Sequence, residues 1–358
     1  MGSDNRCIRC ALPFSFPTMT FTKDGLCEVC ARFEQKWKPW LESKELQAES
    51  ERKLIRILDR AKAKGKLYDC VIGISGGKDS LYTLYLAVKR YGMNPLAVSI
   101  DNGFLTDEAK QVIDKACKKL RVDYIIYRLD MIYELYRHVL LKTGSFCSVC
   151  FIMIIQGLRK FTKSFDIPIA LIGKSSRLDC VSPRGGNPFF FSKVCEGSKN
   201  GIKRPYMFGR GGYFGLMPFF LFNKMVKIPD YVMWDYNEIR RVLKEEMDID
   251  MFTEHDDCWA FPIKQHLMVR RYGFGQKFLK AGVLCRNNML SREDAIKLNE
   301  KELAHKEQLP PVAERFISTL NITMEDFERL PEISSDKYYS GFGNWLLLQR
   351  HKLLRGRA

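Results

Sequence analysis

The chain has 358 residues, of which 46% are hydrophobic, and this apolar content is enough to bury a full core, so we exclude a disordered chain. Its formal net charge of +16 favours a polyanionic partner, such as a nucleotide, a nucleic acid, a phosphorylated sugar or an anionic membrane, and does not choose among them. The length predicts two domains, or one large domain with appendages.

Twelve cysteines fit a disulfide-bonded protein only behind a secretory signal, and residues 1–20 show no charged segment followed by an apolar one. We therefore expect reduced cysteines and a cytoplasmic protein. The longest apolar run, residues 213–226, contains Asn223 and Lys224 and is too short to cross a bilayer, so we expect no transmembrane segment.

The first predicted element is a knuckle built from two Cys-x-x-Cys pairs, Cys7 with Cys10 and Cys27 with Cys30. This doubled spacing is typical of four thiolates arranged tetrahedrally around zinc, and the segment has little apolar content with which to fold without a metal. Redox-active or disulfide pairing is the alternative. Because four thiolates leave no open coordination position, the zinc is expected to be structural, in a domain spanning residues 1–38.

Strands and helices alternate in the next predicted domain, residues 39–180, where a helix over residues 33–64 joins the knuckle to the core. Short apolar runs predict the strands, and the segments between them have helical composition. The predicted strands are 70–74, 96–100, 124–127 and 169–172, and the predicted helices are 81–91, 107–120 and 151–165. This order is typical of an α/β fold with a doubly wound parallel sheet, which binds ligands at the carboxyl ends of its strands.

The last predicted domain, residues 181–358, combines a substrate-binding excursion with a mainly helical C-terminal region. Residues 180–213 are rich in Gly, Pro, Phe and Lys without a clear period, which favours an ordered active-site excursion or a lid. The helices predicted beyond it are 236–247, 262–272, 291–306, 311–320 and 324–330.

The most informative motif is Ser-Gly-Gly-Lys-Asp-Ser at residues 75–80, directly after the first predicted strand. A glycine-rich loop that leads from a strand into a helix points backbone N–H groups at an anion. The spacing is not that of the kinase and GTPase P-loop. It resembles the PP-loop of the adenine nucleotide alpha hydrolase superfamily, a HUP-like fold whose members cleave ATP between the α and β phosphates. An ordinary glycine-rich turn is the alternative.

This resemblance implies which residues hold ATP and Mg²⁺. The pyrophosphate and its Mg²⁺ are placed on Ser75, Gly76, Gly77, Asp79 and Ser80. Lys78 adds a cation, and the implied catalytic residues are Asp79, Lys78 and Ser80. Asp101, at the end of the second strand, is the implied nucleoside contact, with a helix cap as the alternative. Gly173 ends the fourth strand at the ligand-binding edge and is also predicted to contact ATP.

A second cysteine group is predicted from Cys147 and Cys150, a Cys-x-x-Cys pair at the start of a predicted helix. Two thiolates cannot saturate a metal, so we choose Cys258, in a polar segment before a helix, as the third ligand, with Cys180 and Cys195 as competing candidates. Three thiolates suit a 4Fe–4S cluster with one open iron; zinc completed by a histidine and a reduced buried pair are the alternatives. The cysteines expected only to pack in the core are Cys70, Cys117 and Cys285.

With these motifs in order, the chain resembles the N-acetyl sugar amidotransferases of lipopolysaccharide and pseudaminic acid biosynthesis over most of its length. The resemblance rests on both cysteine groups, the loop, Tyr-Gly-Phe-Gly at 272–275 and Ser-Arg-Glu-Asp-Ala at 291–295, although Ser291 with Asp294 is also typical of a helix cap. It implies that an N-acetyl oxygen of a nucleotide-linked sugar is adenylated and that ammonia then displaces AMP, giving an acetamidino group. A separate glutamine amidotransferase and a synthase-like companion are the implied source of ammonia, because no glutaminase nucleophile is visible.

Two other hypotheses remain. The order of knuckle, loop and Cys-x-x-Cys with a distant cysteine also resembles the tRNA thiolation enzymes that use a three-cysteine iron–sulfur cluster. Under that alternative the chain is a sulfurtransferase that thiolates tRNA or a small molecule after adenylation, although the second zinc knuckle usual near their C-terminus is absent. A zinc-knuckle RNA-binding module with an inactive loop is the non-enzymatic hypothesis, and the complete loop sequence argues against it.

Overall fold

The structure is a computed structural model, and it describes residues 5–16, 19–129, 131–175, 177–178, 180, 224–250 and 257–331. Most of the predicted excursion, including Cys195, and nearly all of the apolar run 213–226 lie outside the described residues. Among the described helices, none combines the length and the apolar character that a bilayer crossing requires.

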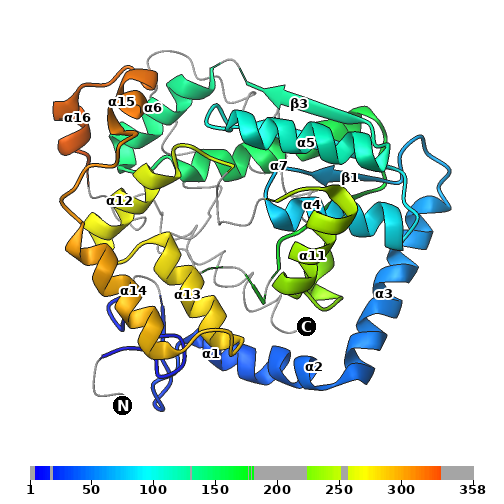
Figure 1. The fold of residues 1–358 in the computed structure, drawn as a ribbon, viewed down its shortest axis with the longest axis horizontal. Coiled ribbons are helices and arrows are strands. Elements are labelled where there is room, and N and C mark those ends of the chain that lie inside the picture. The colour runs from blue at the N-terminus through cyan, green and yellow to red at the C-terminus, as the bar shows by residue number, and fades with distance from the viewer. Residues whose placement is uncertain are drawn as a thin grey trace, which may run out of the picture.

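A five-stranded parallel sheet forms the centre of the fold, with the order β3-β2-β1-β4-β5 (Figure 1). The strands are β1 (Cys70–Gly73), β2 (Pro95–Asp101), β3 (Tyr124–Arg128), β4 (Ile169–Ile172) and β5 (Lys224–Lys227). The chain leaves β1 for β2 and β3 on one side and returns to β4 and β5 on the other. The sheet is therefore doubly wound, as predicted, with its switch point between β1 and β4; the prediction missed β5.

The position of each strand in the sheet explains its sequence. The central strands β1 and β2 are buried almost throughout and are nearly unbroken apolar runs, as parallel strands covered on both faces require. The edge strand β3 alternates instead, with Tyr124 and Ile126 exposed and Ile125 half-buried. Because all the strands are parallel, the loops after β1, β2 and β4 meet at one edge of the sheet.

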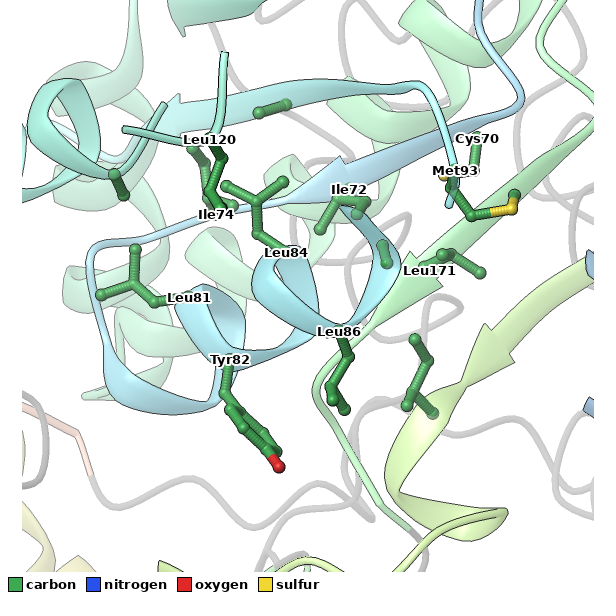
Figure 2. Packing of buried hydrophobic residues seen from close by; sticks show 14 of the residues in the cluster. Cys70, Ile72, Ile74, Leu81, Tyr82, Leu84, Leu86, Met93, Leu120 and Leu171 are labelled. Atoms are coloured by element: carbon green, nitrogen blue, oxygen red, sulfur yellow. The ribbon is translucent and has the colours of Figure 1, made fainter. Parts of the chain in front are cut away.

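Helices cover both faces of the sheet and give the fold two apolar cores. One face carries α3 (Lys44–Lys62), α4 (Lys78–Tyr85), the π-helical turn η2 (Leu86–Arg90), α5 (Asp107–Leu120) and α11 (Tyr236–Met247). The other carries α6 (Ile132–Thr143) and α7 (Cys147–Ser164). In Figure 2, Leu84 of α4 points toward β1; Leu86 of η2 belongs to the same core as Leu171 of β4. The prediction missed α6.

The single helix predicted over residues 33–64 is wrong. The chain forms α1 (Glu28–Arg32), a π-helical segment η1 (Phe33–Trp37), α2 (Lys38–Glu42) and then α3. The break lies at Ser43, whose backbone is extended and whose hydroxyl accepts from the Leu46 N–H at 3.2 Å. Ser43 therefore ends α2 and caps α3, and the chain runs from the knuckle along these helices to the sheet (Figure 1).

The C-terminal region is helical, as predicted; its first three helices pack on the knuckle, and its last two pack in the core with α6 and α7. Its helices are α12 (Phe261–Tyr272), α13 (Gln276–Arg286), α14 (Arg292–Ala304), α15 (Ala313–Thr319) and α16 (Met324–Glu328). The prediction missed α13, whose Phe278 and Leu279 share a core with the knuckle cysteines. A Cβ at Gly282 would lie 3.1 Å from the Cys10 carbonyl oxygen, so this helix lies directly on the knuckle backbone. The division at residues 38 and 180 stays a prediction.

Candidate functional site

The predicted PP-loop joins β1 to α4 at the carboxyl edge of the sheet. Gly76 has φ +83°, and a Cβ there would lie 2.9 Å from the Ala109 carbonyl oxygen, so glycine is required. The Ser80 hydroxyl donates to the Gly77 carbonyl oxygen at 2.8 Å and accepts from the Ser75 N–H at 3.2 Å. Gly77 precedes α4 and has no side chain with which to cap it. The first turn of α4 therefore offers its N–H groups to an anion.

The carboxylate of Asp79 is held in this first turn. Trp234 Nε1 donates to Asp79 Oδ1 at 2.7 Å, and Lys78 Nζ lies 3.4 Å from Asp79 Oδ2. The Asp79 side chain is 34% exposed, so its carboxylate remains accessible beside the loop. The structure thus brings the predicted catalytic residues Asp79, Lys78 and Ser80 together at one helix end.

Two lysines flank one tyrosine ring next to this helix. Lys78 Nζ and Lys280 Nζ each lie 5.1 Å from the centre of the Tyr236 ring, and Lys280 also donates to the Tyr236 hydroxyl at 2.9 Å. Burial raises the pKa of Tyr236, so the phenol stays neutral. Sequence reasoning missed Trp234, Tyr236 and Lys280, because only tertiary packing brings the start of α11 and the middle of α13 to the loop.

Gly173, at the end of β4, has a steric role. A Cβ there would lie 2.4 Å from the Asp79 carbonyl oxygen and 2.7 Å from Thr83 Oγ1. That carbonyl also accepts from the Thr83 hydroxyl at 2.7 Å. Glycine therefore lets α4 pack directly against the end of β4, which fixes the loop on the sheet. Its predicted contact with ATP stays a prediction.

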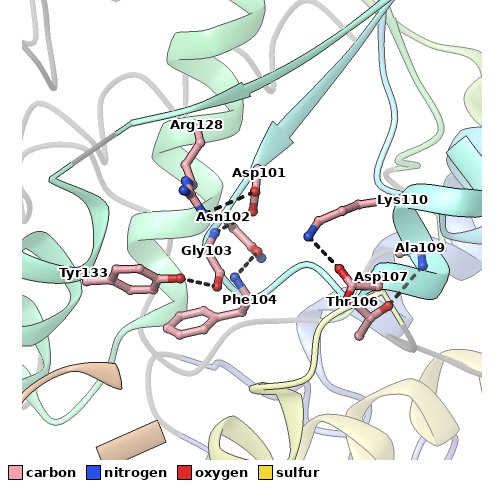
Figure 3. Close-up of polar contacts among 10 residues, drawn as sticks. All are labelled: Asp101, Asn102, Gly103, Phe104, Thr106, Asp107, Ala109, Lys110, Arg128 and Tyr133. Carbon is pink, nitrogen blue, oxygen red and sulfur yellow. Dashed lines mark hydrogen bonds and ion pairs between the residues drawn. The ribbon is translucent and has the colours of Figure 1, made fainter. Parts of the chain in front are cut away.

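Asp101 lies at the end of β2 and organises the turn that follows (Figure 3). Its carboxylate accepts from the Gly103 N–H at 2.8 Å and lies 3.9 Å from an Arg128 guanidinium nitrogen. The alternative interpretation of Asp101 as a helix cap is wrong, because α5 begins at Thr106, whose hydroxyl accepts from the Ala109 N–H. Asp101 is therefore at the edge of the sheet where such folds bind ligands.

A cavity of about 430 Å³ opens beside this turn. Its charged lining residues are Asp101, Asp107, Glu108, Lys110, Arg128 and Arg315. Trp259 also lines it, and the Arg315 guanidinium carbon lies 4.2 Å from the centre of the Trp259 ring. The volume is within the range of small-molecule sites, and the aromatic and charged groups suit a polar ligand with a flat ring.

The four knuckle cysteines form one buried group. Their sulfur atoms all lie within 4.8 Å of one another, and Cys10 Sγ is 3.7 Å from Cys27 Sγ. Zn–S bonds of about 2.3 Å in a tetrahedron separate the sulfurs by about 3.8 Å, so the group fits one zinc. The N–H groups of Cys27 and Cys30 donate to the sulfurs of Cys7 and Cys27, at 3.3 Å and 3.4 Å. These bonds favour the thiolates that zinc requires.

A buried arginine adds positive charge beside the knuckle. Arg286, the last residue of α13, is 3% exposed. Burial opposes its charge, but the sulfurs of Cys10, Cys30 and Cys27 raise the pKa of Arg286 above its ordinary value. Zinc with four thiolates carries a net negative charge, so a buried guanidinium next to it is compensated. α13 thus supplies the knuckle with both apolar contacts and a cation.

Cys147, Cys150 and Cys258 also come together, from segments far apart in the sequence. Cys147 begins α7 with Cys150 one turn later, and Cys258 forms an antiparallel bridge with Leu105, in the turn after β2. Asn102 Nδ2 lies 3.5 Å from Cys150 Sγ and 3.9 Å from Cys258 Sγ, so one amide donates to both thiols. Sequence reasoning chose these three cysteines and missed Asn102.

The spacing of these three thiols differs from that of the knuckle. In the described part of the chain, only the knuckle sulfurs form a group within 4.8 Å, so the second set is more open. A 4Fe–4S cluster binds each thiolate to a different iron, so its three thiolates need not lie as close together as four thiolates around one zinc. Burial raises the pKa of Cys150 to about 11, opposed by the Asn102 hydrogen bond, and burial also raises that of Cys258. Metal binding must therefore displace thiol protons.

The remaining described cysteines lie outside both groups. Cys70, Cys117 and Cys285 are buried among apolar side chains, which confirms their predicted packing role. Cys180, a competing candidate for the third ligand, packs instead against the knuckle core and near Arg286. Among the described candidates for the third ligand, Cys258 is therefore the one that lies with Cys147 and Cys150.

Residues 246–349 match the family model described as "LPS biosynthesis protein WbpG-like, C-terminal domain". The uncharacterized protein MJ1599 of Methanocaldococcus jannaschii is 25% identical to this chain over 256 residues, which are 70% of this chain and 79% of that protein. The family match confirms the predicted resemblance to surface-polysaccharide proteins.

Similar solved structures include two synthetases and a thiolase. NMN synthetase from Francisella tularensis has a TM-score of 0.36 and 13% identity, covering 78% of this chain and 95% of that one. The U34-tRNA thiolase NcsA from Methanococcus maripaludis, with its 4Fe-4S cluster, has a TM-score of 0.35 and 17% identity, covering 86% and 90%. NH3-dependent NAD synthetase from Campylobacter jejuni has a TM-score of 0.35 and 13% identity, covering 74% and 97%.

At these TM-scores, the fold assignment rests on the strand order and on the loop between β1 and α4 rather than on the superpositions. The described part of residues 246–349 includes α12 to α16. Of these helices, α12, α13 and α14 pack on the knuckle, and α13 carries Lys280. The residues matched to the WbpG-like C-terminal domain are therefore carried in one chain with a doubly wound parallel sheet whose first loop has the PP-loop sequence.

Proposed function

We propose that the protein is an ATP-dependent, AMP-forming amidotransferase that converts the N-acetyl group of a nucleotide-linked sugar into an acetamidino group in surface-polysaccharide biosynthesis. The observation that carries this proposal is the presence, in one chain, of a PP-type loop and a domain matched to an LPS biosynthesis protein. The uncapped start of α4 and the lysines around Tyr236 support binding of a polyphosphate there.

In this proposal the loop holds the phosphates of ATP. Ser75 and Ser80 fix the loop shape, and the N–H groups of α4 face the pyrophosphate. Lys78 and Lys280 supply positive charge as charge develops on the departing pyrophosphate. Mg²⁺ bound with ATP neutralises part of that charge, and Asp79 is the accessible carboxylate that would hold it.

The reaction consists of two displacements. The N-acetyl oxygen attacks the α-phosphorus, the bond from that phosphorus to the bridging oxygen breaks, and pyrophosphate leaves. Ammonia then adds to the activated carbon, and AMP departs with the former acetyl oxygen, which leaves an amidine. The cavity between Asp101 and Trp259 lies at the same edge of the sheet as the loop and is our candidate site for the nucleoside or the acceptor.

Ammonia is expected from a separate glutamine amidotransferase that works with a synthase-like companion subunit in the cytoplasm. The first test supplies ammonia directly, together with ATP and nucleotide-linked N-acetyl sugars. We expect AMP and pyrophosphate to form in equal amounts with a product in which NH replaces one oxygen, detected by mass spectrometry. Release of ADP would contradict the loop assignment, and AMP release with an unchanged sugar would contradict the acceptor.

The grouping of Cys147, Cys150 and Cys258 favours a second candidate function. The side-chain amide of Asn102 contacts two of these thiols, Cys150 and Cys258. Under it, the chain is a sulfurtransferase that uses an iron–sulfur cluster to thiolate tRNA or a small molecule after the same adenylation. Supplying sulfide in place of ammonia separates the two functions. A thiolated product formed from sulfide, with no amidine formed from ammonia, would establish the second.

Replacing Lys280 with methionine is expected to lower the rate of AMP formation about tenfold, because the variant loses a cation beside the loop while keeping a chain of similar length. The control is Lys277→Met on the same helix, where the side chain is exposed. Steady-state rates of pyrophosphate release measure both variants. Equal rates for the two would remove Lys280 from the site.

A further inference from the structure

Tyr136 has a buried hydroxyl group for which the described chain provides no well-formed hydrogen bond. Tyr136 lies on α6 and is 0% exposed, with its ring 4.7 Å from that of Phe104 and 6.0 Å from that of Phe146. Among the described residues, its hydroxyl makes no hydrogen bond of normal geometry and has only a weak contact with the Cys150 side chain. Native proteins satisfy nearly all such groups, and an unpaired one costs about 1–3 kcal/mol. An acceptor outside the described chain would remove this cost.

The groups around this hydroxyl are the three cysteines of the second set. Cys147 and Cys258 pack against the core that contains Tyr136, and Cys150 is the side chain that its hydroxyl contacts. A tyrosine hydroxyl is protonated at neutral pH, so it is able to donate a hydrogen bond. A metal-bound thiolate or sulfide at these cysteines would accept a hydrogen bond and would lie next to the Tyr136 hydroxyl.

Asn102 is a second donor aimed at the same place. Its Oδ1 accepts from the Phe104 N–H at 2.8 Å, which fixes the side-chain amide with its Nδ2 toward Cys150 and Cys258. The Phe104 ring packs against Tyr136, so one short turn after β2 positions both donors. Two polar donors that converge on three thiols in an otherwise apolar core indicate a built site rather than a chance grouping of cysteines.

We propose that Tyr136 is a positioning residue that donates its O–H to a sulfur atom of an iron–sulfur cluster held by Cys147, Cys150 and Cys258. The inference rests on the cluster invoked above for the second candidate function, and it holds whether nitrogen or sulfur is transferred. Tyr136 binds no iron. Its hydrogen bond stabilises the reduced cluster, which carries more negative charge on sulfur, and therefore raises the reduction potential.

The test compares anaerobically prepared wild-type protein with Tyr136→Phe, which keeps the ring and removes the hydroxyl. We expect both to contain iron and acid-labile sulfide, with the oxidised-to-reduced ratio of the variant shifted about tenfold toward oxidised at a given potential. For a one-electron couple this shift is about 59 mV, measured by a redox titration followed by electron paramagnetic resonance. Tyr68→Phe is the matched control, because its hydroxyl already donates to Asp123 at 2.8 Å, away from the cysteines.

Thermal unfolding gives an independent readout. The cluster-free Tyr136→Phe protein is expected to be as stable as wild type or more stable, since it loses an unpaired buried hydroxyl, whereas the cluster-loaded variant is expected to be less stable. Equal potentials for wild type and Tyr136→Phe, with clusters in both, would overturn the role of Tyr136 and leave the cluster intact. Wild-type protein without iron or sulfide would overturn the cluster and this inference together, while amidine formation would still stand.

Discussion

Replacing Asp79 with asparagine is expected to lower AMP and pyrophosphate release at least about a hundredfold while leaving the fold intact. Asparagine has the same shape and keeps an oxygen for the Trp234 N–H, which now donates to Asp79 at 2.7 Å. What it removes is the negative charge that would hold Mg²⁺ beside the phosphates. Pyrophosphate release at saturating ATP and Mg²⁺ measures the loss, and far-ultraviolet circular dichroism with thermal unfolding checks the fold.

The control for this prediction is Asp166→Asn. Asp166 is 79% exposed and pairs with Lys66, so its charge contributes to neither the loop nor the cysteine groups. We expect the control to retain the wild-type rate. A rate for Asp79→Asn within about threefold of the control would contradict the assignment of Asp79 and would leave the loop with a purely structural role.

Much of the sheet domain was predictable because its signals are local. The strand over Cys70–Gly73 is a continuous apolar run, the loop after it contains two glycines, and α5 begins at a threonine cap before a periodic helix. Each of these features depends on neighbours in the sequence. The order of apolar strands and helices then predicted the doubly wound topology, since parallel strands need helical crossovers.

The prediction missed α13 and β5 because their local sequences are not typical of a helix and a strand. α13 contains Gly282, a residue that weakens helices, and here the glycine is needed because the Cys10 backbone lies against it. The short strand β5 has lysines at both ends, which hide its apolar centre. Its pairing with β4 provides the reason for a strand, and that pairing is not visible in the sequence.

The residues of the candidate site also fall into two classes: those that a local motif predicts and those that only the fold brings together. The loop and the Cys-x-x-Cys pairs are short motifs whose spacing predicts their chemistry. Trp234, Lys280, Asn102 and Tyr136 are single residues of common types, and only their positions in the fold bring them to Asp79 or to the cysteines. Cys258 lies between these cases, because its polar surroundings indicated a site while its partners became evident only from the fold.

Removing a ligand of the zinc that we predict in the knuckle is expected to unfold more than the knuckle. Cys10→Ala deletes one of four ligands from a group with little apolar content of its own, and it should abolish stoichiometric zinc binding and lower the melting temperature. The matched control is Cys285→Ala, in the same core, where the thiol only donates to the Ser291 carbonyl oxygen at 3.3 Å. We expect the control to retain zinc, measured by atomic emission. Equal zinc contents would contradict the knuckle assignment.

In Cys10→Ala, the loss of stability should extend from the knuckle along α13 to the loop at residues 75–80. Phe278 and Leu279 of this helix pack on the knuckle, while Lys280 on the same helix donates to Tyr236 beside Lys78. We therefore expect amide hydrogen exchange in α13 to accelerate in Cys10→Ala, whereas the amides of β1 and β2 remain protected. The rate of AMP formation should fall by about the factor seen for Lys280→Met, because the same cation is withdrawn. Faster exchange confined to the knuckle itself, with an unchanged rate, would show that zinc stabilises that segment alone.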